Sequence, residues 1–143
     1  MKNDFKYSDI TEKIIGCAMR VHQKMKNGYP EVIYQRCMAI EFQRAGLNYR
    51  QEVEMSVFYD NICVGRRRVD FLVEEKVSVE LKAISNLTNE NLAQALNYLE
   101  AQHLEVGLLL NFGAPSLQFK RLINQQKLNN PSNQNVNPGN QRL

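Results

Sequence analysis

Two neighbouring segments of this chain place charged side chains inside apolar runs. Asp70 lies within residues 69–73, and Glu80 and Lys82 lie within residues 77–83. A charge in a buried strand is costly unless it is paired, bound to a metal or solvated in a cleft. Two carboxylates and an amine so close together are the residue types that hold a divalent cation and activate a water molecule for hydrolysis.

The alternation of side chains along a strand decides whether these groups share a face. Residues two apart point the same way, so Glu80 lies with Lys82, and Asp70 lies with Arg68. An antiparallel hairpin with a three-residue loop at 74–76 places Asp70 opposite Glu80, with Cβ atoms about 4.5–5.5 Å apart. A two-residue turn would split the carboxylates between the two faces, because a shift of one residue inverts a strand. The metal-site hypothesis therefore requires that loop or a bulge, and the alternative is two amphipathic strands with solvated polar faces.

Composition favours one soluble globular domain. The chain has 143 residues, of which 43% are hydrophobic and 23% charged, and it contains no apolar run near the roughly 20 residues of a membrane span. Cys17, Cys37 and Cys63 have no close spacing, which argues against a zinc site or a disulfide framework and for a reducing cytoplasm. The net charge of +3 is too small to indicate nucleic-acid binding. The basic run at 66–68 fits phosphate contact or a solvated strand start with one arginine offsetting a carboxylate.

Apolar spacing predicts the elements that must position these residues. Helices are expected over about 10–26, 30–45 and 88–102, and strands over about 48–59, 62–73, 77–84, 106–110 and 119–123. Asp9 with Glu12 is expected to cap the first helix, Thr88 or Asn89 the third, and the second is expected to bury Ile33, Cys37 and Ile40. This order predicts an α/β fold with a mixed sheet over residues 1–124. Residues 125–143, rich in Asn and Gln, are predicted to be a disordered tail.

Further segments resemble a known family. Residues 28–34 read Gly-Tyr-Pro-Glu-Val-Ile-Tyr and fit the pattern GxxExxY. Together with Asp70, the Glu80-Leu81-Lys82 segment and residues 111–116, they resemble the GxxExxY family of the PD-(D/E)xK nuclease superfamily over about residues 8–124. The resemblance implies a restriction-endonuclease-like core, in which helices flank a mixed sheet with an antiparallel meander. The proline of the superfamily name is absent, since Val69 precedes Asp70, and this departure concerns local backbone shape.

The resemblance also implies a site. The residues carried over as catalytic are Glu31, Asp70, Glu80, Lys82 and Gln94; the metal ligands are Asp70, Glu80, the Leu81 carbonyl and Glu31; Tyr34, Tyr98 and Arg68 are accessory. The implied cofactor is Mg²⁺ or Mn²⁺, which prefer oxygen ligands. Three of these residues have a simpler interpretation: Glu31 as an acid favoured at a helix N-terminus, Tyr34 as a core residue and Gln94 as a surface residue.

The functional expectation is a metal-dependent nuclease that hydrolyses phosphodiester bonds in DNA. The alternative is a catalytically silent nuclease-fold module that binds nucleic acid or a protein partner, because fold does not determine function. Nucleic acid is the expected partner, a homodimer or a protein partner is possible on either interpretation, and no membrane association is expected. A cytoplasmic location follows from the cysteine usage.

Overall fold

The computed structural model describes residues 6–125. Its elements are α1 (Ser8–Met25), α2 (Glu31–Arg44), β1 (Tyr49–Tyr59), β2 (Ile62–Val73), β3 (Val77–Lys82), α3 (Asn89–Ala101), β4 (Val106–Asn111) and β5 (Gln118–Ile123). The predicted order of helices and strands is confirmed. The predicted tail falls, from residue 126 on, outside the described residues.

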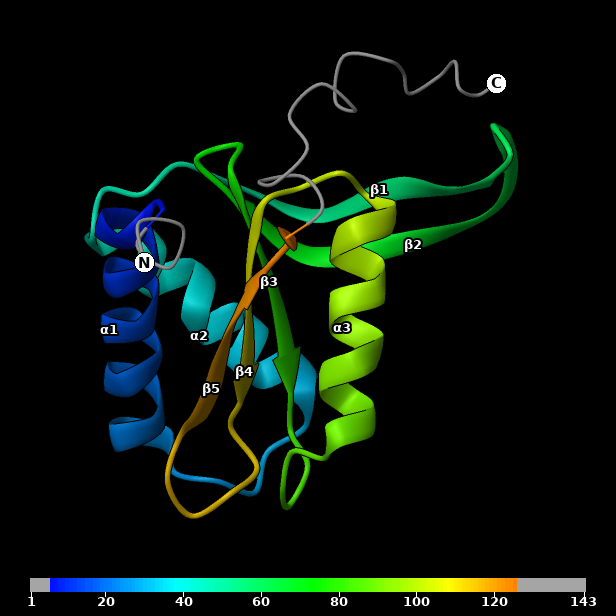
Figure 1. Cartoon of the computed structure of the whole chain (residues 1–143). Coiled ribbons are helices and arrows are strands. Elements are labelled where there is room, and N and C mark those ends of the chain that lie inside the picture. The colour runs from blue at the N-terminus through cyan, green and yellow to red at the C-terminus, as the bar shows by residue number, and fades with distance from the viewer. Residues whose placement is uncertain (1–5, 126–143) are drawn as a thin grey trace.

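The five strands form one mixed sheet in the order β1-β2-β3-β4-β5. Neighbouring strands are antiparallel except β3 and β4, which are parallel. A parallel pair needs a crossover connection, and α3 supplies it (Figure 1). The predicted α/β class with a mixed sheet and an antiparallel meander is therefore confirmed.

The helices cover the sheet from both faces. Helices α1 and α2 lie on one face and α3 on the other (Figure 1). The first face holds the main core, where fully buried Phe71 and Val79 pack with Ile14 of α1 and Phe42 of α2. On the second face α3 approaches closely, since a Cβ at Gly107 would lie 3.2 Å from a methyl carbon of Leu99. Within residues 6–125, no helix is long and apolar enough to cross a membrane.

The β2–β3 hairpin has the loop that the metal-site hypothesis requires. Val73 pairs with Val77 and Phe71 with Val79, so three residues, 74–76, form the loop. Glu74 and Glu75 both adopt left-handed backbone conformations there, with φ of 54° and 57°. The strand pairing ends at Phe71 and Val79, one residue before Asp70 and Glu80, and beyond it the Leu81 N–H donates to Asp70 Oδ2 at 2.7 Å.

The outer part of β2 leaves the body of the sheet. β2 pairs with β3 only over residues 71–73, whereas it pairs with β1 along nearly its full length. The two-residue turn at Asp60 and Asn61, both with positive φ, closes this β1–β2 hairpin, which projects beyond the helices (Figure 1). The strands β2 and β3 therefore diverge just before Asp70.

The predicted buried face of the second helix is only partly correct, since Cys37 packs, partly buried, against the core. Tyr34, Met38 and Phe42 are fully buried, whereas Ile40 is 50% exposed. These three residues lie four apart, on one side of the helix, and that side meets aromatic residues of the sheet region: Phe42 contacts Phe71 edge to face at 5.0 Å. Aromatic and thioether side chains therefore define the packed face of α2, and its aliphatic residues lie beside that face.

The two predicted helix caps had different outcomes. The N-cap of α1 is Tyr7, in a left-handed conformation with φ of 58° and without a side-chain cap hydrogen bond, so the predicted cap by Asp9 and Glu12 is wrong. Thr88 caps α3 as predicted. Its hydroxyl accepts from the Asn91 backbone N–H, and the Asn91 side chain accepts from the Thr88 N–H, which makes a reciprocal capping box.

Candidate active site

The predicted acids and the lysine meet where β2 and β3 diverge. Asp70 comes from β2, and Glu80 and Lys82 come from β3. Glu31 opens α2, which starts near the end of β3 (Figure 1). The charges of Asp70 and Lys82 act on the pKa values of both Glu31 and Glu80, so these four residues form one electrostatic cluster.

Asp70 is fixed by the backbone of the opposite strand. Its Oδ2 accepts a hydrogen bond of 2.7 Å from the Leu81 N–H. Burial raises the pKa of Asp70, while this hydrogen bond and the positive charges of Arg67 and Lys82 oppose the rise. The carboxyl group is thus anchored through one oxygen beside the Glu80–Lys82 segment.

Glu80 has the most strongly shifted acid–base equilibrium of the cluster. Burial, aided by the charge of Asp70, raises the pKa of Glu80 to about 7, against the opposing charges of Arg67 and Lys82. Its Oε1 forms an ion pair of 2.9 Å with Arg67 Nη2. A carboxyl group with a pKa near neutrality is a common property of functional sites.

Arg67 is the site residue that the sequence analysis missed. Its guanidinium stacks 3.9 Å from the ring centroid of Tyr98 on α3 while pairing with Glu80. The side chain of Arg68, expected as an accessory residue, is 62% exposed and pairs with Glu52 at 3.7 Å, and its accessory role stays a prediction. Face alternation favoured Arg68, because residues two apart on one strand share a face, but it does not predict which residues meet across two strands that have separated. At Arg67, β2 is no longer paired with β3. The basic run at 66–68 was the only feature of the sequence that pointed to Arg67.

Glu31 lies at the edge of the cluster. Its side chain reaches solvent at the first turn of α2. Burial and the charge of Asp70 raise the pKa of Glu31, and the charges of Lys82 and Arg67 oppose the rise. An acid in this turn also interacts favourably with the helix dipole, so both interpretations given to this residue fit its position.

Comparison with known proteins identifies the family. The family model described as the PD-(D/E)XK nuclease superfamily matches residues 8–122. The chain belongs to the PD-(D/E)XK nuclease superfamily. No curated protein matches the chain. The crystal structure of SSO0001 is similar with a TM-score of 0.44 and 16% identity, over 74% of this chain and 60% of that chain. The chain thus spans 60% of the length of that solved protein.

Gln94 and Tyr98, which the resemblance to the superfamily carried over, lie on α3. Gln94 is exposed and donates a hydrogen bond of 3.3 Å from Nε2 to the Tyr98 hydroxyl. Both residues line a hollow along α3, together with Asn97 and Ala93. Tyr98 also contacts the Arg67 guanidinium, which pairs with Glu80, whereas Asp70, Glu80 and Lys82 do not line this hollow.

Tyr34 lies in the core. It is fully buried and stacks on Phe112 with ring centroids 4.7 Å apart. Its hydroxyl donates 2.5 Å to the Lys26 carbonyl and accepts from the Tyr29 N–H at 3.3 Å. The aromatic residue of the GxxExxY pattern therefore ties the α1–α2 connection to the core. By holding the start of α2, Tyr34 also positions Glu31, three residues earlier.

A buried amide holds the end of β3. Asn111 is fully buried; its Oδ1 accepts from the Ile84 N–H at 2.9 Å and its Nδ2 donates to the Ile84 carbonyl at 2.9 Å. The Phe112 N–H donates to the Lys82 carbonyl at 2.8 Å. Gly113 allows this close approach, because a Cβ there would overlap the Ile84 backbone. The last residue of β4 and the residues that follow it thus position Lys82, a role that no spacing in the sequence indicated.

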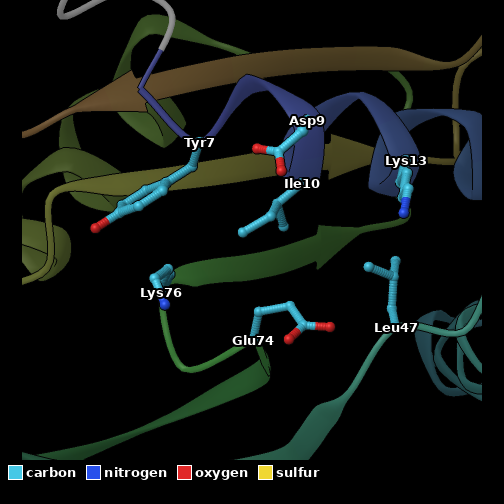
Figure 2. A pocket seen from close by; sticks show the side chains of 7 residues that line it. All are labelled: Tyr7, Asp9, Ile10, Lys13, Leu47, Glu74 and Lys76. Carbon is cyan, nitrogen blue, oxygen red and sulfur yellow. The ribbon is translucent and has the colours of Figure 1, made fainter.

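A separate hollow lies at the opposite end of β3 (Figure 2). Tyr7, Ile10 and Lys13 from the start of α1 line it, facing Glu74 and Lys76 of the β2–β3 loop. Lys76 directly precedes β3, whereas Lys82 ends it. The pocket in Figure 2 is therefore distinct from the acid cluster.

The donor types of the cluster fit Mg²⁺ or Mn²⁺, but the donors are not gathered around one point. Glu31, Asp70 and Glu80 supply the carboxylate oxygens that these ions prefer. Among residues 6–125, no group of three or more histidine, cysteine or acidic side chains lies close enough to hold a metal ion. One Glu80 oxygen faces Arg67, and one Asp70 oxygen faces the Leu81 N–H. An ion would have to draw the carboxylates together.

Proposed function

We propose that this protein is a divalent-metal-dependent nuclease that hydrolyses phosphodiester bonds in DNA. The observation that carries the proposal is that Glu31, Asp70, Glu80 and Lys82 lie close enough together for the charges of Asp70 and Lys82 to act on the pKa values of Glu31 and Glu80. A structural domain has no need of three partly buried acids at one place, because each raises the cost of ionising the others. The same proposal includes membership of the GxxExxY family and a cytoplasmic location.

The proposed metal ligands are Asp70, Glu80, the Leu81 carbonyl and Glu31, which binds directly or through water. A bound Mg²⁺ or Mn²⁺ polarises the scissile phosphate and lowers the pKa of a coordinated water. The anchoring of Asp70 by the Leu81 N–H leaves its second oxygen as the donor. This supports a ligand set built from β2 and β3, with α2 contributing from the side.

The other roles belong to polar groups around the acids. The Lys82 ammonium orients the attacking water or stabilises charge that develops on the phosphate. Gln94 and Tyr98 form the α3 wall of the site, along the hollow that the two residues line. This wall is where a nucleic-acid backbone would approach the acids.

The second candidate is a module of this fold that binds nucleic acid or a protein partner without cutting it. The absence of a gathered ligand set among residues 6–125 favours this candidate, as does the use of Arg67 to neutralise Glu80. A homodimer or a protein partner belongs to either proposal. Metal-dependent cleavage separates the two.

The test is a cleavage assay of the full chain on plasmid, linear duplex, single-stranded DNA and RNA, with Mg²⁺ or Mn²⁺ and with EDTA. We expect Asp70→Ala, Glu80→Ala and Lys82→Ala to lose at least about 100-fold in rate, as for other stabilising groups of a transition state, and Glu31→Ala to lose less. Lys82→Ala should retain metal binding. Glu75→Ala is the matched control, since Glu75 is an exposed acid paired with Arg50 at the far end of the hairpin. Wild-type activity equal to that of Asp70→Ala on every substrate would favour the binding module.

A further inference from the structure

Arg67 occupies a position in which it would compete with a divalent cation for Glu80. Its Nη2 lies 2.9 Å from Glu80 Oε1, and the two side chains are only 21% and 15% exposed. Its charge also acts on Asp70 and Glu31. Arg67 is thus a cation among the same three acids that would ligate a metal.

The contacts of Arg67 leave its donors incompletely used. Arginine commonly binds a carboxylate through two parallel N–H bonds, but here Nη2 alone contacts Glu80, and Nη1 donates to the Arg68 carbonyl at 2.9 Å. The Nε atom is buried and has no hydrogen-bond partner. A buried donor without a partner carries a desolvation penalty, so this arrangement is not the best that the guanidinium can reach with an oxyanion.

Tyr98 provides a support that does not depend on Glu80. The guanidinium lies over the face of the Tyr98 ring at 3.9 Å. Stacking uses the face of the guanidinium and leaves its in-plane N–H groups available for oxygen acceptors. A change of partner from carboxylate to phosphate therefore does not require the stacking to be lost.

We propose that Arg67 is an exchangeable cation of this site. It neutralises Glu80 in the metal-free protein, and when a divalent ion takes Glu80 its guanidinium turns to a phosphate of the nucleic acid. A metal ion and a guanidinium on one carboxylate repel each other, and the phosphate supplies the paired oxygens that Arg67 lacks. The inference rests on the proposed metal-dependent action on nucleic acid and adds a substrate-binding residue to it.

The first test measures the affinity for Mn²⁺ by calorimetry on the full chain after removal of metals. We expect Arg67→Met to bind Mn²⁺ about tenfold more tightly than wild type or better, because a competing charge is removed. Arg67→Lys keeps the positive charge, so its affinity for Mn²⁺ should be closer to that of wild type. Arg66→Met is the matched control and should change nothing, because the Arg66 side chain is 65% exposed and pairs with Glu54 farther along the β1–β2 hairpin. Unchanged or weaker binding by a folded Arg67→Met variant would overturn the exchange.

The second test measures binding of a short DNA duplex by fluorescence anisotropy, in a Lys82→Ala background that slows cleavage. With Mg²⁺, Arg67→Met should bind DNA about tenfold more weakly than the background protein; with EDTA the two should bind equally. Equal affinity in Mg²⁺ would overturn the phosphate contact. If Arg67→Met binds Mn²⁺ more tightly than wild type as predicted but the protein cleaves no substrate, the exchange stands and the nuclease activity is rejected. If neither wild type nor Arg67→Met binds Mn²⁺, both the exchange and the metal-dependent activity are rejected.

Discussion

At the scale of single residues, the site is a balance between three acids and two cations. Burial raises the pKa of Glu31, Asp70 and Glu80, and the charges of Lys82 and Arg67 hold that rise back. Arg67 alone makes a direct ion pair with one of these acids among the described residues. An internal positive charge therefore stabilises the site, in which burial opposes ionisation of the three acids.

The raised pKa of Glu80 predicts that stability falls with pH. The folded chain keeps the Glu80 proton up to about pH 7, whereas the unfolded chain releases it near the ordinary value of 4.5. Between these values the unfolded state binds fewer protons, so the free energy of unfolding decreases as pH rises, by about 2–4 kcal/mol in total. Glu80→Gln should remove most of this slope.

Urea unfolding with EDTA between pH 5 and pH 8 measures the slope. Glu75→Gln is the control, because Arg50 holds the pKa of Glu75 below its ordinary value of 4.5, outside this range. A Glu80→Gln slope equal to that of wild type would contradict the assignment of the proton to Glu80.

Tyr34 gives a prediction that separates a structural from a catalytic role. Tyr34→Phe removes the hydroxyl between the Lys26 carbonyl and the Tyr29 N–H, which should cost about 1–3 kcal/mol of unfolding free energy. Affinity for Mn²⁺ should stay within about twofold, since the hydroxyl is held by the backbone. Tyr59→Phe, at a tyrosine 69% exposed, is the control and should be neutral. Full stability with lost metal binding would instead place Tyr34 in the site.

At the scale of elements, the sequence predicted what regular periodicity controls. The three-residue loop between β2 and β3 follows from the need to bury Phe71 and Val79 on one face. Periodicity failed where an element departs from regularity or where packing is aromatic. Arg67 enters the site where β2 leaves β3, and α2 buries Tyr34 against Phe112, which follows β4, and Phe42 against Phe71 of β2. Both arrangements depend on residues that are far apart in the sequence.

The segment after β4 supplies the prediction at this scale. Gly113→Ala should destabilise the chain by about 1–3 kcal/mol or more, because the new methyl group would overlap the Ile84 backbone. It should also lower the cleavage rate through Lys82, whose carbonyl accepts from the neighbouring Phe112 N–H. Gly65→Ala is the matched control, since nothing lies within 4 Å of its Cβ position. Urea unfolding midpoints and cleavage rates of both variants test the two effects. Equal stability of the two variants would contradict the close approach of Gly113 to the Ile84 backbone.

At the scale of the whole molecule, the order of elements was predictable and the meeting of distant ones was not. Alternating and helical patterns identified the meander, the crossover helix and the buried β4. No sequence pattern indicated that Asn111 would bind both backbone groups of Ile84. It also did not indicate that Tyr98 of α3 would carry an arginine of β2. Such contacts depend on the relative placement of elements, which periodicity does not contain.

The domain boundary predicted at residue 124 can be tested by truncation. The Asn124 N–H donates to the Glu105 carbonyl at 2.9 Å, and its side chain donates to the Leu104 carbonyl at 3.0 Å. A chain that ends after residue 125 should unfold at the same urea concentration as the full chain. A chain that ends after residue 123 should lose about 1–3 kcal/mol. If the chain that ends after residue 125 is substantially less stable than the full chain, the boundary lies within residues 126–143.

The whole molecule is proposed to build one metal site from β2, β3 and the start of α2, and crystals soaked in Mn²⁺ test this most directly. An anomalous difference map should show a peak within about 2.1 Å of oxygens of Asp70 and Glu80, with Arg67 no longer paired to Glu80. The same soak of Asp70→Asn crystals should lose the peak. A map without density between Asp70 and Glu80 at saturating Mn²⁺, or with a peak only at other residues, would contradict the proposed site.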